Sequence, residues 1–392
     1  MSDMIAPPTM LSGVRVLDLT RVLAGPLCTM ILGDLGADVL KVERPGTGDD
    51  TRGWGPPFDE RGESAYYLGV NRNKRSLAAD LDDPADRDLV LRLVAGADVV
   101  VDNFRPGTLE RRGVNPRELL AANPRLVWCT ITGFGEASPR PGYDFVVQAE
   151  RGWMAITGTA DGEPMKVGVA LADVVTGKDA AIAVLAALTE RGLRAGPLPV
   201  ERRRLVVSLA DSAAAALVNV AQNVLVTGQD ARRWGNAHPN LVPYQLFDAS
   251  DRPFVVAVGN DAQWVACALA LQLPELAADV RFAANAGRVA HREELVARLA
   301  ERLRERPAAE WLERLDVAGV PAGVVRTVLE TVREAGGSPL TGMPPSVPGG
   351  TVRLPPPRLD EHGEVIRESG WGAFRTAPEV RLAPDRDATL LR

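Results

Sequence analysis

The stretch VRVLDLTRVLAGPLCTMILGDLGADVLKV, residues 14–42, contains two strand-like segments on either side of a helical one. Residues 14–19 alternate apolar with polar side chains, which predicts a β-strand. Pro26 is typical of the first turn of a helix, and we expect that helix over residues 26–35. Residues 38–42 then predict a second strand. The stretch therefore predicts a β-α-β unit of about 30 residues, with its two strands parallel.

The same alternation continues along the first half of the chain. Strands are expected at residues 97–101, 126–132 and 204–209, and helices at residues 89–94 and 212–226. Strands that alternate with helices favour an α/β domain built on a largely parallel sheet.

The composition changes near Thr227, and a smaller α+β domain is expected to follow. Residues 228–242 are polar and irregular, and residues 336–357 are so rich in Gly and Pro that they predict a long loop or linker. The segments between them predict a strand at 254–258 and helices at 263–271, 292–304 and 308–317. We therefore predict residues 1–226 as the first part of a large domain, 227–331 as a small domain, and 332–392 as a return linker and the C-terminal part of the large domain.

Composition excludes several classes of protein. The 392 residues contain 45 Lys and Arg against 51 Asp and Glu, a net charge of −6, which argues against a dedicated nucleic-acid binder. Cys28, Cys129 and Cys267 are far apart in apolar contexts, so neither a zinc ribbon nor a disulfide framework is expected. No apolar run approaches the length of a membrane span, and residues 1–10 lack a signal-peptide pattern. We expect a soluble, cytoplasmic protein.

Several catalytic motifs are also missing from the sequence. The three histidines, His238, His291 and His362, have no metal-binding spacing, so no metal site is expected. Neither a GxSxG elbow nor a GxxxxGK[ST] loop is present. The run Gly46–Thr51 begins like a dinucleotide fingerprint but lacks the third glycine.

A basic group of residues lies near the expected strand ends. It comprises Arg44, Asn71–Ser76, Asn103–Gly107, Arg111 and Arg112. Ligands bind α/β sheets at such loops, and arginine matches phosphate bidentately, so this group could bind a phosphorylated ligand. On residue types alone, a solvated surface with ion pairs is the favoured alternative.

Two acidic positions are candidates for a site. Pro141–Asp144 is a turn whose Tyr and Asp could enter a site, although the Asp could equally cap the next segment. Asp173 precedes a stretch with apolar residues at helical spacing and could be no more than an N-cap. In the functional alternative, a helix N-terminus stabilises its ionised carboxylate, which acts as a covalent nucleophile.

Taken together and in order, these segments resemble the family III CoA-transferases. This family includes formyl-CoA transferase, carnitine CoA-transferase and α-methylacyl-CoA racemase. The matching segments are LDLTRVLAGPLCTMILGDLGADVLKVERPGTGDDTRGW, NRNKRSLAADL, ADVVVDNFRPGTLERRGV, GYDFVVQAERG, VALADVVTGKDAAIAVLAAL, RWGNAHPNLVPYQLFDASD and EWLERLDVAGVPAGVV. They cover nearly the whole chain in collinear order.

The resemblance implies a fold, an assembly and a set of site residues. The fold is a Rossmann-like large domain with a parallel sheet plus a smaller α+β domain, in an interlocked homodimer. Asp173 takes the place of the family's catalytic aspartate. No metal or permanently bound cofactor is implied, because an acyl-CoA and a carboxylic acid are the substrates. The implied CoA-binding positions are Leu23, Ala24, Arg44, Ala79, Asp80, Leu81, Asp82, Asn103, Phe104, Arg105 and Arg111, and those at the thioester end are Pro141, Gly142, Tyr143 and Asp144.

The resemblance also implies a mechanism. Asp173 attacks the donor acyl-CoA to give a mixed anhydride, which the CoA thiolate converts into an aspartyl-CoA thioester. The acceptor carboxylate then takes up CoA through a second anhydride. Neither ATP nor a metal ion is needed, because each step exchanges activated acyl groups of similar energy.

Two departures from the family pattern bear on the substrate. Leu23 occupies the position of a glutamine in formyl-CoA transferase, and no glycine run follows Gly228, which argues against formate or oxalate. Tyr143 occupies the position of a histidine in the racemase branch, and its ordinary pKa near 10 is too high for easy proton abstraction. An acyl-CoA racemase or epimerase is therefore the second hypothesis, and a non-catalytic CoA-binding protein is the third.

Overall fold

The computed structural model describes residues 9–376, and these form two compact units. The first unit contains the described residues up to Trp153, residues Val167–Asn223 and the described residues from Val332 onward. The second contains Met154–Lys166 and Val224–Thr331. This division assigns 154–166 to the second unit, whereas the sequence-based division kept that segment with the first. Expectations for residues 1–8 and 377–392, including the absence of a signal peptide, lie outside the described residues.

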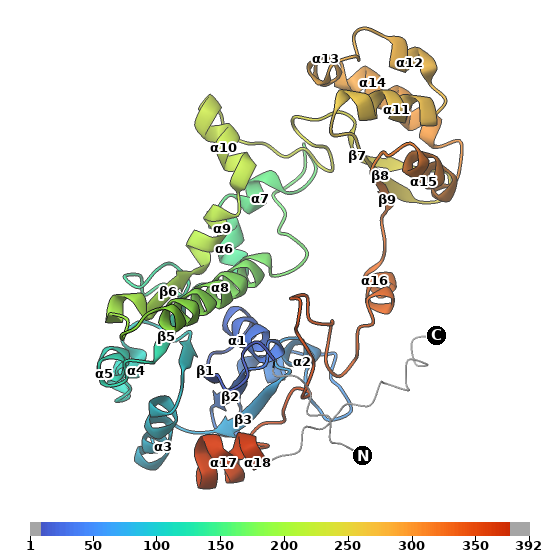
Figure 1. Ribbon diagram of the computed structural model, residues 1–392. Coiled ribbons are helices and arrows are strands. Elements are labelled where there is room, and N and C mark those ends of the chain that lie inside the picture. The colour runs from blue at the N-terminus through green and yellow to red at the C-terminus, as the bar shows by residue number, and fades with distance from the viewer. Residues whose placement is uncertain (1–8, 377–392) are drawn as a thin grey trace. The chain divides into compact units, whose positions relative to one another are not determined.

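A parallel sheet forms the centre of the first unit (Figure 1). Its strand order is β3-β2-β1-β4-β5-β6, and every neighbouring pair is parallel. The order reverses between β1 and β4, and at such a point ligands bind beyond the carboxyl ends of the strands. The predicted α/β fold with a parallel sheet is confirmed. The strands are β1 (Arg15–Leu19), β2 (Asp38–Glu43), β3 (Lys74–Ala78), β4 (Val99–Asp102), β5 (Val127–Thr132) and β6 (Arg204–Ser208).

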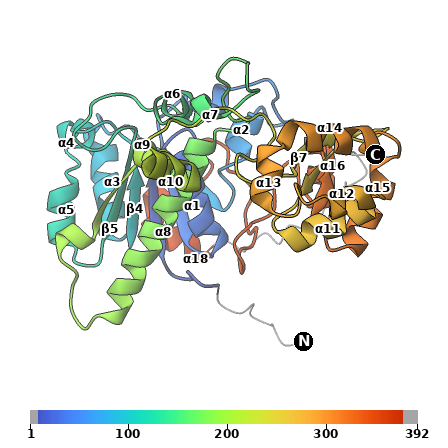
Figure 2. The same ribbon diagram turned by 90° about the horizontal axis from the view of Figure 1, so that it is seen from above.

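Helices cover both faces of this sheet (Figure 2). Successive strand residues point to opposite faces, so Val16 joins the core beneath α1 and α8, and Leu17 joins the core beneath α3 and α17. Both side chains are fully buried. The four helices are α1 (Ala24–Asp34), α8 (Leu171–Leu193), α3 (Pro84–Ala95) and α17 (Gly363–Ser369).

Helices α1 and α8 cross in close contact. A Cβ atom at Gly177 would lie 2.6 Å from the backbone oxygen of Ala24, which is closer than a real side chain tolerates. The two helix starts therefore lie side by side because residue 177 is glycine. Asp173, one turn earlier on α8, is thereby placed near the start of α1.

The expected helix at residues 212–226 is two helices. Helix α9 (Leu209–Ala215) and α10 (Val218–Thr227) meet at a bend of 69°, where Val218 has a φ of 40°. Uniform apolar composition across the bend hid this break from the sequence pattern. No single helix within residues 9–376 is long and apolar enough to span a membrane, although this bent pair meets the criterion by length and composition.

The chain returns to the first unit after residue 332. Asn73 donates its backbone N–H to the Leu354 carbonyl at 2.9 Å, and Trp371 donates its indole N–H to the Leu93 carbonyl at 2.9 Å. The remaining elements of this unit are η1 (Asp50–Gly53), α2 (Ala65–Leu68), α4 (Thr108–Arg111), α5 (Pro116–Ala122), α6 (Asp144–Glu150), η2 (Val200–Arg202), η3 (Gly370–Gly372) and α18 (Ala373–Thr376). Helix α7 (Trp153–Ile156) begins at Trp153 of the first unit, and its other residues belong to the second.

The second unit combines a small antiparallel sheet with a group of helices, as the α+β prediction required. The sheet order is β7-β8-β9, and buried Phe254, Trp264 and Trp311 form part of its core. Helix α16 (Val328–Glu334) leads out of it. The strands are β7 (Tyr244–Asp248), β8 (Pro253–Ala257) and β9 (Ala322–Val324), and the helices are α11 (Asp261–Ala270), α12 (Pro274–Ala278), α13 (Asn285–Ala290), α14 (Arg292–Leu303) and α15 (Ala308–Val317).

Candidate active site

Two of the cavities in the first unit lie where the strand order reverses. The loops after β1 and β4 are tied together there. The Arg21 N–H donates to Asn103 Oδ1 at 3.0 Å, and Asn103 Nδ2 donates back to the Arg21 carbonyl at 2.8 Å. This reciprocal pair fixes the two loops against each other at the position where the fold is expected to bind a ligand.

The larger cavity has a volume of about 500 Å³ and lies beyond the carboxyl ends of β1 to β4. Four arginines line it, and three of them have carboxylate neighbours: Arg21 and Arg44 beside Asp50, and Arg112 beside Asp82. The lining residues are Leu19, Thr20, Arg21, Val42, Glu43, Arg44, Gly48, Asp49, Ala79, Asp80, Leu81, Asp82, Phe104, Arg105, Thr108 and Arg112.

The smaller cavity, of about 180 Å³, contains Asp173 and shares Arg21, Phe104 and Arg105 with the larger one. The two cavities therefore adjoin, and one extended ligand could occupy both. The lining residues are Arg21, Val22, Leu23, Ala24, Asp50, Asn103, Phe104, Arg105, Pro106, Ile131, Thr132, Gly133, Ser138, Arg140, Pro141, Gly142, Tyr143, Asp173 and Leu209.

Asp173 lies in the first turn of α8, next to a second carboxylate. Asp144, the first residue of α6, accepts the backbone N–H of Ala172 at 2.8 Å and that of Asp173 at 3.4 Å. Asp144 therefore caps α8 from another helix, since α8 has no side-chain cap of its own. This cap fixes the first turn that carries Asp173.

A buried amide orients Asp144 in turn. Gln148, fully buried one turn along α6, donates through Nε2 to Asp144 Oδ2 at 2.7 Å. Its Oε1 accepts the backbone N–H of Val167 at 2.9 Å, which assigns the two ends of the amide. Asp144 is thus bonded through both of its carboxylate oxygens.

The pKa of Asp173 is raised to about 7, first by burial and then by the negative charge of Asp144. No Lys or Arg among residues 9–376 forms an ion pair with it. Asp173 is therefore a basic carboxylate that is partly protonated at neutral pH. A perturbed carboxylate in a cavity is typical of a reactive group.

Tyr66 lies within electrostatic range of Asp173, and no sequence motif indicated it. Burial raises the pKa of Tyr66 to about 12, and the charges of Asp173 and Asp144 contribute. Its phenol is consequently protonated at neutral pH and available as a donor. The ring packs edge-on against Trp54, with centroids 5.1 Å apart.

The structure brings most of the expected site residues to the two cavities. Asp144 lies behind the cavity wall, as the cap of α8. Arg111 lines neither cavity and donates to Thr108 Oγ1 at 3.1 Å, whereas its neighbour Arg112 lines the larger one. The smaller cavity contains Leu23, Ala24, Asn103, Phe104, Arg105, Pro141, Gly142, Tyr143 and Asp173, and the larger contains Arg44, Ala79, Asp80, Leu81 and Asp82.

The segment Asn71–Ser76 is neither a solvated surface nor a cavity wall. It leads into β3, and all six residues are buried. Lys74 pairs with Asp18 at 2.9 Å, and Arg72 pairs with Asp34 at 2.6 Å. These cations are internal, and their partners are distant in sequence, so composition could not indicate their burial.

Arg21 and Arg140 are cavity residues that the sequence did not single out. Arg140 lies 4.1 Å over the Phe134 ring and pairs with Glu150 at 2.5 Å. The Arg105 guanidinium, in contrast, has no ion-pair partner within the described part of the chain. Within residues 9–376, no group of three or more His, Cys, Asp or Glu side chains could hold a metal ion.

Comparison with known proteins gives a consistent result. The model of CoA-transferase family III matches residues 11–362. Succinyl-CoA:glutarate CoA-transferase of Mus musculus is 42% identical over 378 residues, covering 91% of this chain and 85% of the relative. Acetyl-CoA:oxalate CoA-transferase of Acetobacter aceti is 39% identical, covering 91% and 94%. A crystal structure of a CaiB/BaiF family protein from Brucella suis matches with a TM-score of 0.79 at 42% identity, covering 92% of this chain and 99% of that chain.

Proposed function

The chain belongs to CoA-transferase family III, a family of enzymes, and from that premise we propose that it moves CoA from an acyl-CoA to a dicarboxylic acid with Asp173 as the covalent carrier. The observation that carries this proposal is the position of Asp173. It is an uncompensated carboxylate in a small cavity that adjoins a larger, arginine-lined one.

The larger cavity suits the nucleotide end of CoA. Arg44 and Arg112 lie on its wall with only exposed carboxylate partners, which phosphate groups can replace. Phe104 and Arg105 form the boundary with the smaller cavity. A CoA thioester that follows this path would present its carbonyl carbon to Asp173.

A carboxylate in this position can perform the whole transfer. An Asp173 oxygen attacks the donor carbonyl, the C–S bond breaks, and a mixed anhydride and CoA thiolate result. The thiolate attacks the aspartyl carbonyl, releases the donor acid and leaves an aspartyl-CoA thioester. The acceptor carboxylate displaces the thiolate to form a second anhydride. The thiolate then attacks the acceptor-derived carbonyl, which yields the new acyl-CoA and regenerates the aspartate.

Two observations support a dicarboxylic acceptor. Both named relatives are described as acting on such acids, glutarate and oxalate. In this chain the unpaired Arg105 and the exposed Arg140 line the cavity of Asp173. While one carboxylate of the acceptor reacts, its second carboxylate can pair with a guanidinium there.

The proposed reaction is tested by mass spectrometry. Succinyl-CoA is offered with glutarate, oxalate, formate or butyrate, and the CoA products are identified. We expect glutaryl-CoA, and butyrate as a poor acceptor. Deuterated water forms a second arm of the experiment. Incorporation of one deuterium beside the thioester without CoA transfer would instead identify a racemase, and neither product would identify a binding protein.

The proposed CoA path is tested by two neighbouring arginines. The family resemblance assigns CoA contact to Arg111, whereas the cavity assigns it to Arg112. We expect Arg112→Ala to raise the KM for acyl-CoA by roughly tenfold to a hundredfold, because a charge-assisted hydrogen bond is lost. Arg111→Ala should have a much smaller effect. The reverse order would contradict the proposed path.

The same proposal includes a homodimer. No residue of α10 is buried in the single chain, and Val218, Leu225 and Val226 are each at least 70% exposed. A second copy could cover this apolar surface, as the family resemblance implies. Sedimentation on dilution should show a dimer wherever the protein is folded. A folded monomer at low concentration would contradict the dimer but not the assignment of Asp173.

A further inference from the structure

Val22, in the loop between β1 and α1, has an unusual backbone conformation. Its φ is 72°, a left-handed value that a β-branched residue adopts only under constraint. Val22 lines the cavity of Asp173, beside Leu23 and Ala24. Strain of this kind at a cavity wall indicates that the surrounding structure imposes the conformation.

Polar groups fix the first three residues of this loop, Thr20, Arg21 and Val22. The backbone N–H and the hydroxyl of Thr20 donate to Asp18 Oδ1 at 2.9 and 2.5 Å, and the Thr20 carbonyl accepts from Lys41 Nζ at 2.8 Å. Arg21 is fixed by its reciprocal pair with Asn103. The Val22 N–H donates to Asp49 Oδ1 at 3.2 Å. This last bond contacts the strained residue itself.

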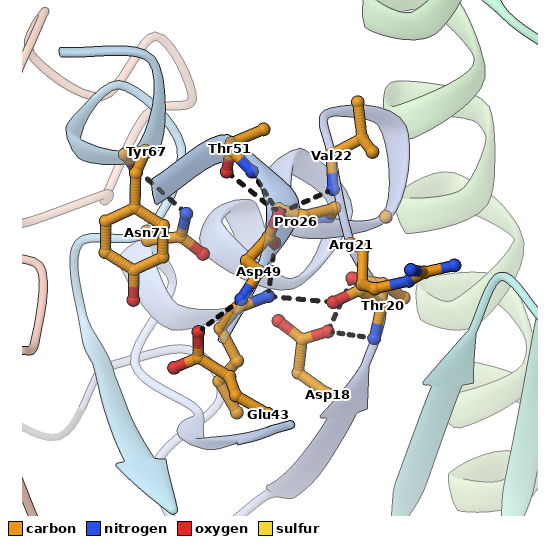
Figure 3. Close-up of polar contacts among 12 residues, drawn as sticks. Asp18, Thr20, Arg21, Val22, Pro26, Glu43, Asp49, Thr51, Tyr67 and Asn71 are labelled. Carbon is orange, nitrogen blue, oxygen red and sulfur yellow. Dashed lines mark hydrogen bonds and ion pairs between the residues drawn. The ribbon is translucent and has the colours of Figure 1, made fainter. Parts of the chain in front are cut away.

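Asp49 is itself held firmly (Figure 3). Its side chain is buried, and Oδ1 also accepts the backbone N–H and hydroxyl of Thr51 at 3.0 and 2.8 Å. Its Oδ2 lies 3.0 Å from Lys41 Nζ, and its own N–H donates to Glu43 Oε2 at 3.1 Å. The charged carboxylate thus has a fixed place under the loop.

We propose that Asp49 is a positioning residue for CoA transfer, because its carboxylate fixes Val22 in the left-handed conformation and so places the wall of the Asp173 cavity. This inference rests on the proposed function for its reaction. Asp49 would touch neither substrate nor the reacting atoms of Asp173. Its effect would pass through the backbone of Val22 to Leu23 and Ala24.

A set of combined variants tests this role. Asp49→Asn should lower kcat/KM for succinyl-CoA and glutarate by at least about tenfold, since the hydrogen bond to the strained residue loses its negative charge and the ion pair with Lys41 is broken. Glycine adopts a positive φ at no steric cost, so in a Val22→Gly background the same substitution should cost about threefold or less. Val22→Ala is the matched control, because alanine also loses the valine methyl groups but keeps the strain. In that background the full loss should persist.

A role that is merely structural would give a different pattern. If the loss from Asp49→Asn were equal in the Gly, Ala and Val backgrounds, the positioning role would be overturned. All variants are compared at a temperature where circular dichroism shows each to be folded.

Thermal unfolding provides a second measurement if Asp49→Asn does not fold. Elsewhere in a protein glycine is less stable than alanine, but at this strained position the Val22→Gly variant should melt at least as high as Val22→Ala. A clearly lower midpoint for the glycine variant would overturn the inference. A wild-type protein that moves no CoA would contradict the proposed function instead, and the thermal comparison would still test the strain at Val22 on which the inference depends.

Discussion

Two groups of carboxylates in the same unit have opposite electrostatic surroundings. Asp18 and Asp49 lie in an internal network beneath the loop that leads into α1, where Lys74 and Lys41 pair with them at 2.9 and 3.0 Å. Asp173 lies in the first turn of α8, with another carboxylate as its charged neighbour. Asp18 and Asp49 are buried and Asp173 and Asp144 are half-buried, and only the first group contains opposing charges.

The pKa values follow from this difference. Burial alone would raise the pKa of Asp18, but Lys74, Lys41 and the hydrogen bonds from two threonine hydroxyls together lower that pKa below its ordinary value. Burial and Asp144 act together to raise the pKa of Asp173 to about 7. Asp18 is therefore charged at neutral pH and has a structural role. Asp173 is basic and has no cationic partner among the described residues, as the proposed nucleophile should.

The largest expected effect comes from Asp173→Asn. The amide keeps the shape of the side chain but cannot form the anhydride, so CoA transfer should fall by roughly a thousandfold or more. Fold and CoA affinity should persist, as circular dichroism and calorimetry would show. Near-normal transfer by this variant would mean that Asp173 differs from the internal carboxylates in pKa only, and not in function.

Substitutions in the internal network should lower the free energy of unfolding. Lys74→Met leaves the buried Asp18 without its closest cation, and we expect a loss of roughly 3–5 kcal/mol in the free energy of unfolding. Arg298→Ala, which breaks an exposed pair with Glu275, is the control and should change stability far less. Denaturant titration measures both. Equal losses would show that Asp18 does not depend on Lys74 to compensate its buried charge.

The sequence predicted the second group of carboxylates better than the first. Asp173 was a candidate because it precedes an apolar-periodic segment, and Asp144 because it follows a Pro-Gly turn. Both lie in family motifs. Their contact was not predictable, since Asp144 caps a helix that begins 27 residues later in the chain. Nothing in local spacing shows that the two carboxylates are neighbours.

Strand β3 shows why the sequence pattern did not predict the internal network. Its residues KRSLA have no clean alternation, and two cations in five residues indicate a surface loop. Lys74 is buried because Asp18, 56 residues earlier, and Asn71 accept from its amine at 2.9 Å. Strands β1, β4 and β5 are mostly apolar and were predicted. Periodicity detects burial of apolar side chains but not burial of compensated charges.

Asp144→Asn should change the pH dependence of kcat/KM for CoA transfer. As the proposed nucleophile, Asp173 would react as the carboxylate, so wild-type kcat/KM should rise with pH through about 7. Removing the like charge of Asp144 lowers the pKa of Asp173, and this limb of the profile should move to lower pH. Glu190→Gln, at the far end of α8, is the matched loss of one negative charge and should leave the limb in place. If the rising limb of the profile stayed in place in Asp144→Asn, the charge of Asp144 would not act on the pKa of Asp173.

The smallest expected effect is in stability against pH. The folded pKa of Asp173 exceeds its unfolded value, so its stabilising contribution is fully present below pH 3.8 and is lost as pH rises through about 7. Asp173→Asn should therefore gain stability relative to wild type over that range. Asp18, whose pKa is lowered, contributes in the opposite sense, and its stabilisation is lost as pH falls below 3.8. Parallel unfolding curves of wild type and Asp173→Asn at all pH values would contradict the first statement.

Chemical trapping tests most directly whether Asp173 is a covalent carrier. Wild-type protein is incubated with succinyl-CoA and hydroxylamine, digested, and sequenced by tandem mass spectrometry. An activated aspartyl group is attacked by hydroxylamine, so a hydroxamate should appear on the peptide that contains Asp173 and nowhere on Asp18, Asp49 or Asp144. The Asp173→Asn protein should give none. A hydroxamate on another carboxylate, or active transfer with no trapped enzyme, would contradict the covalent role of Asp173.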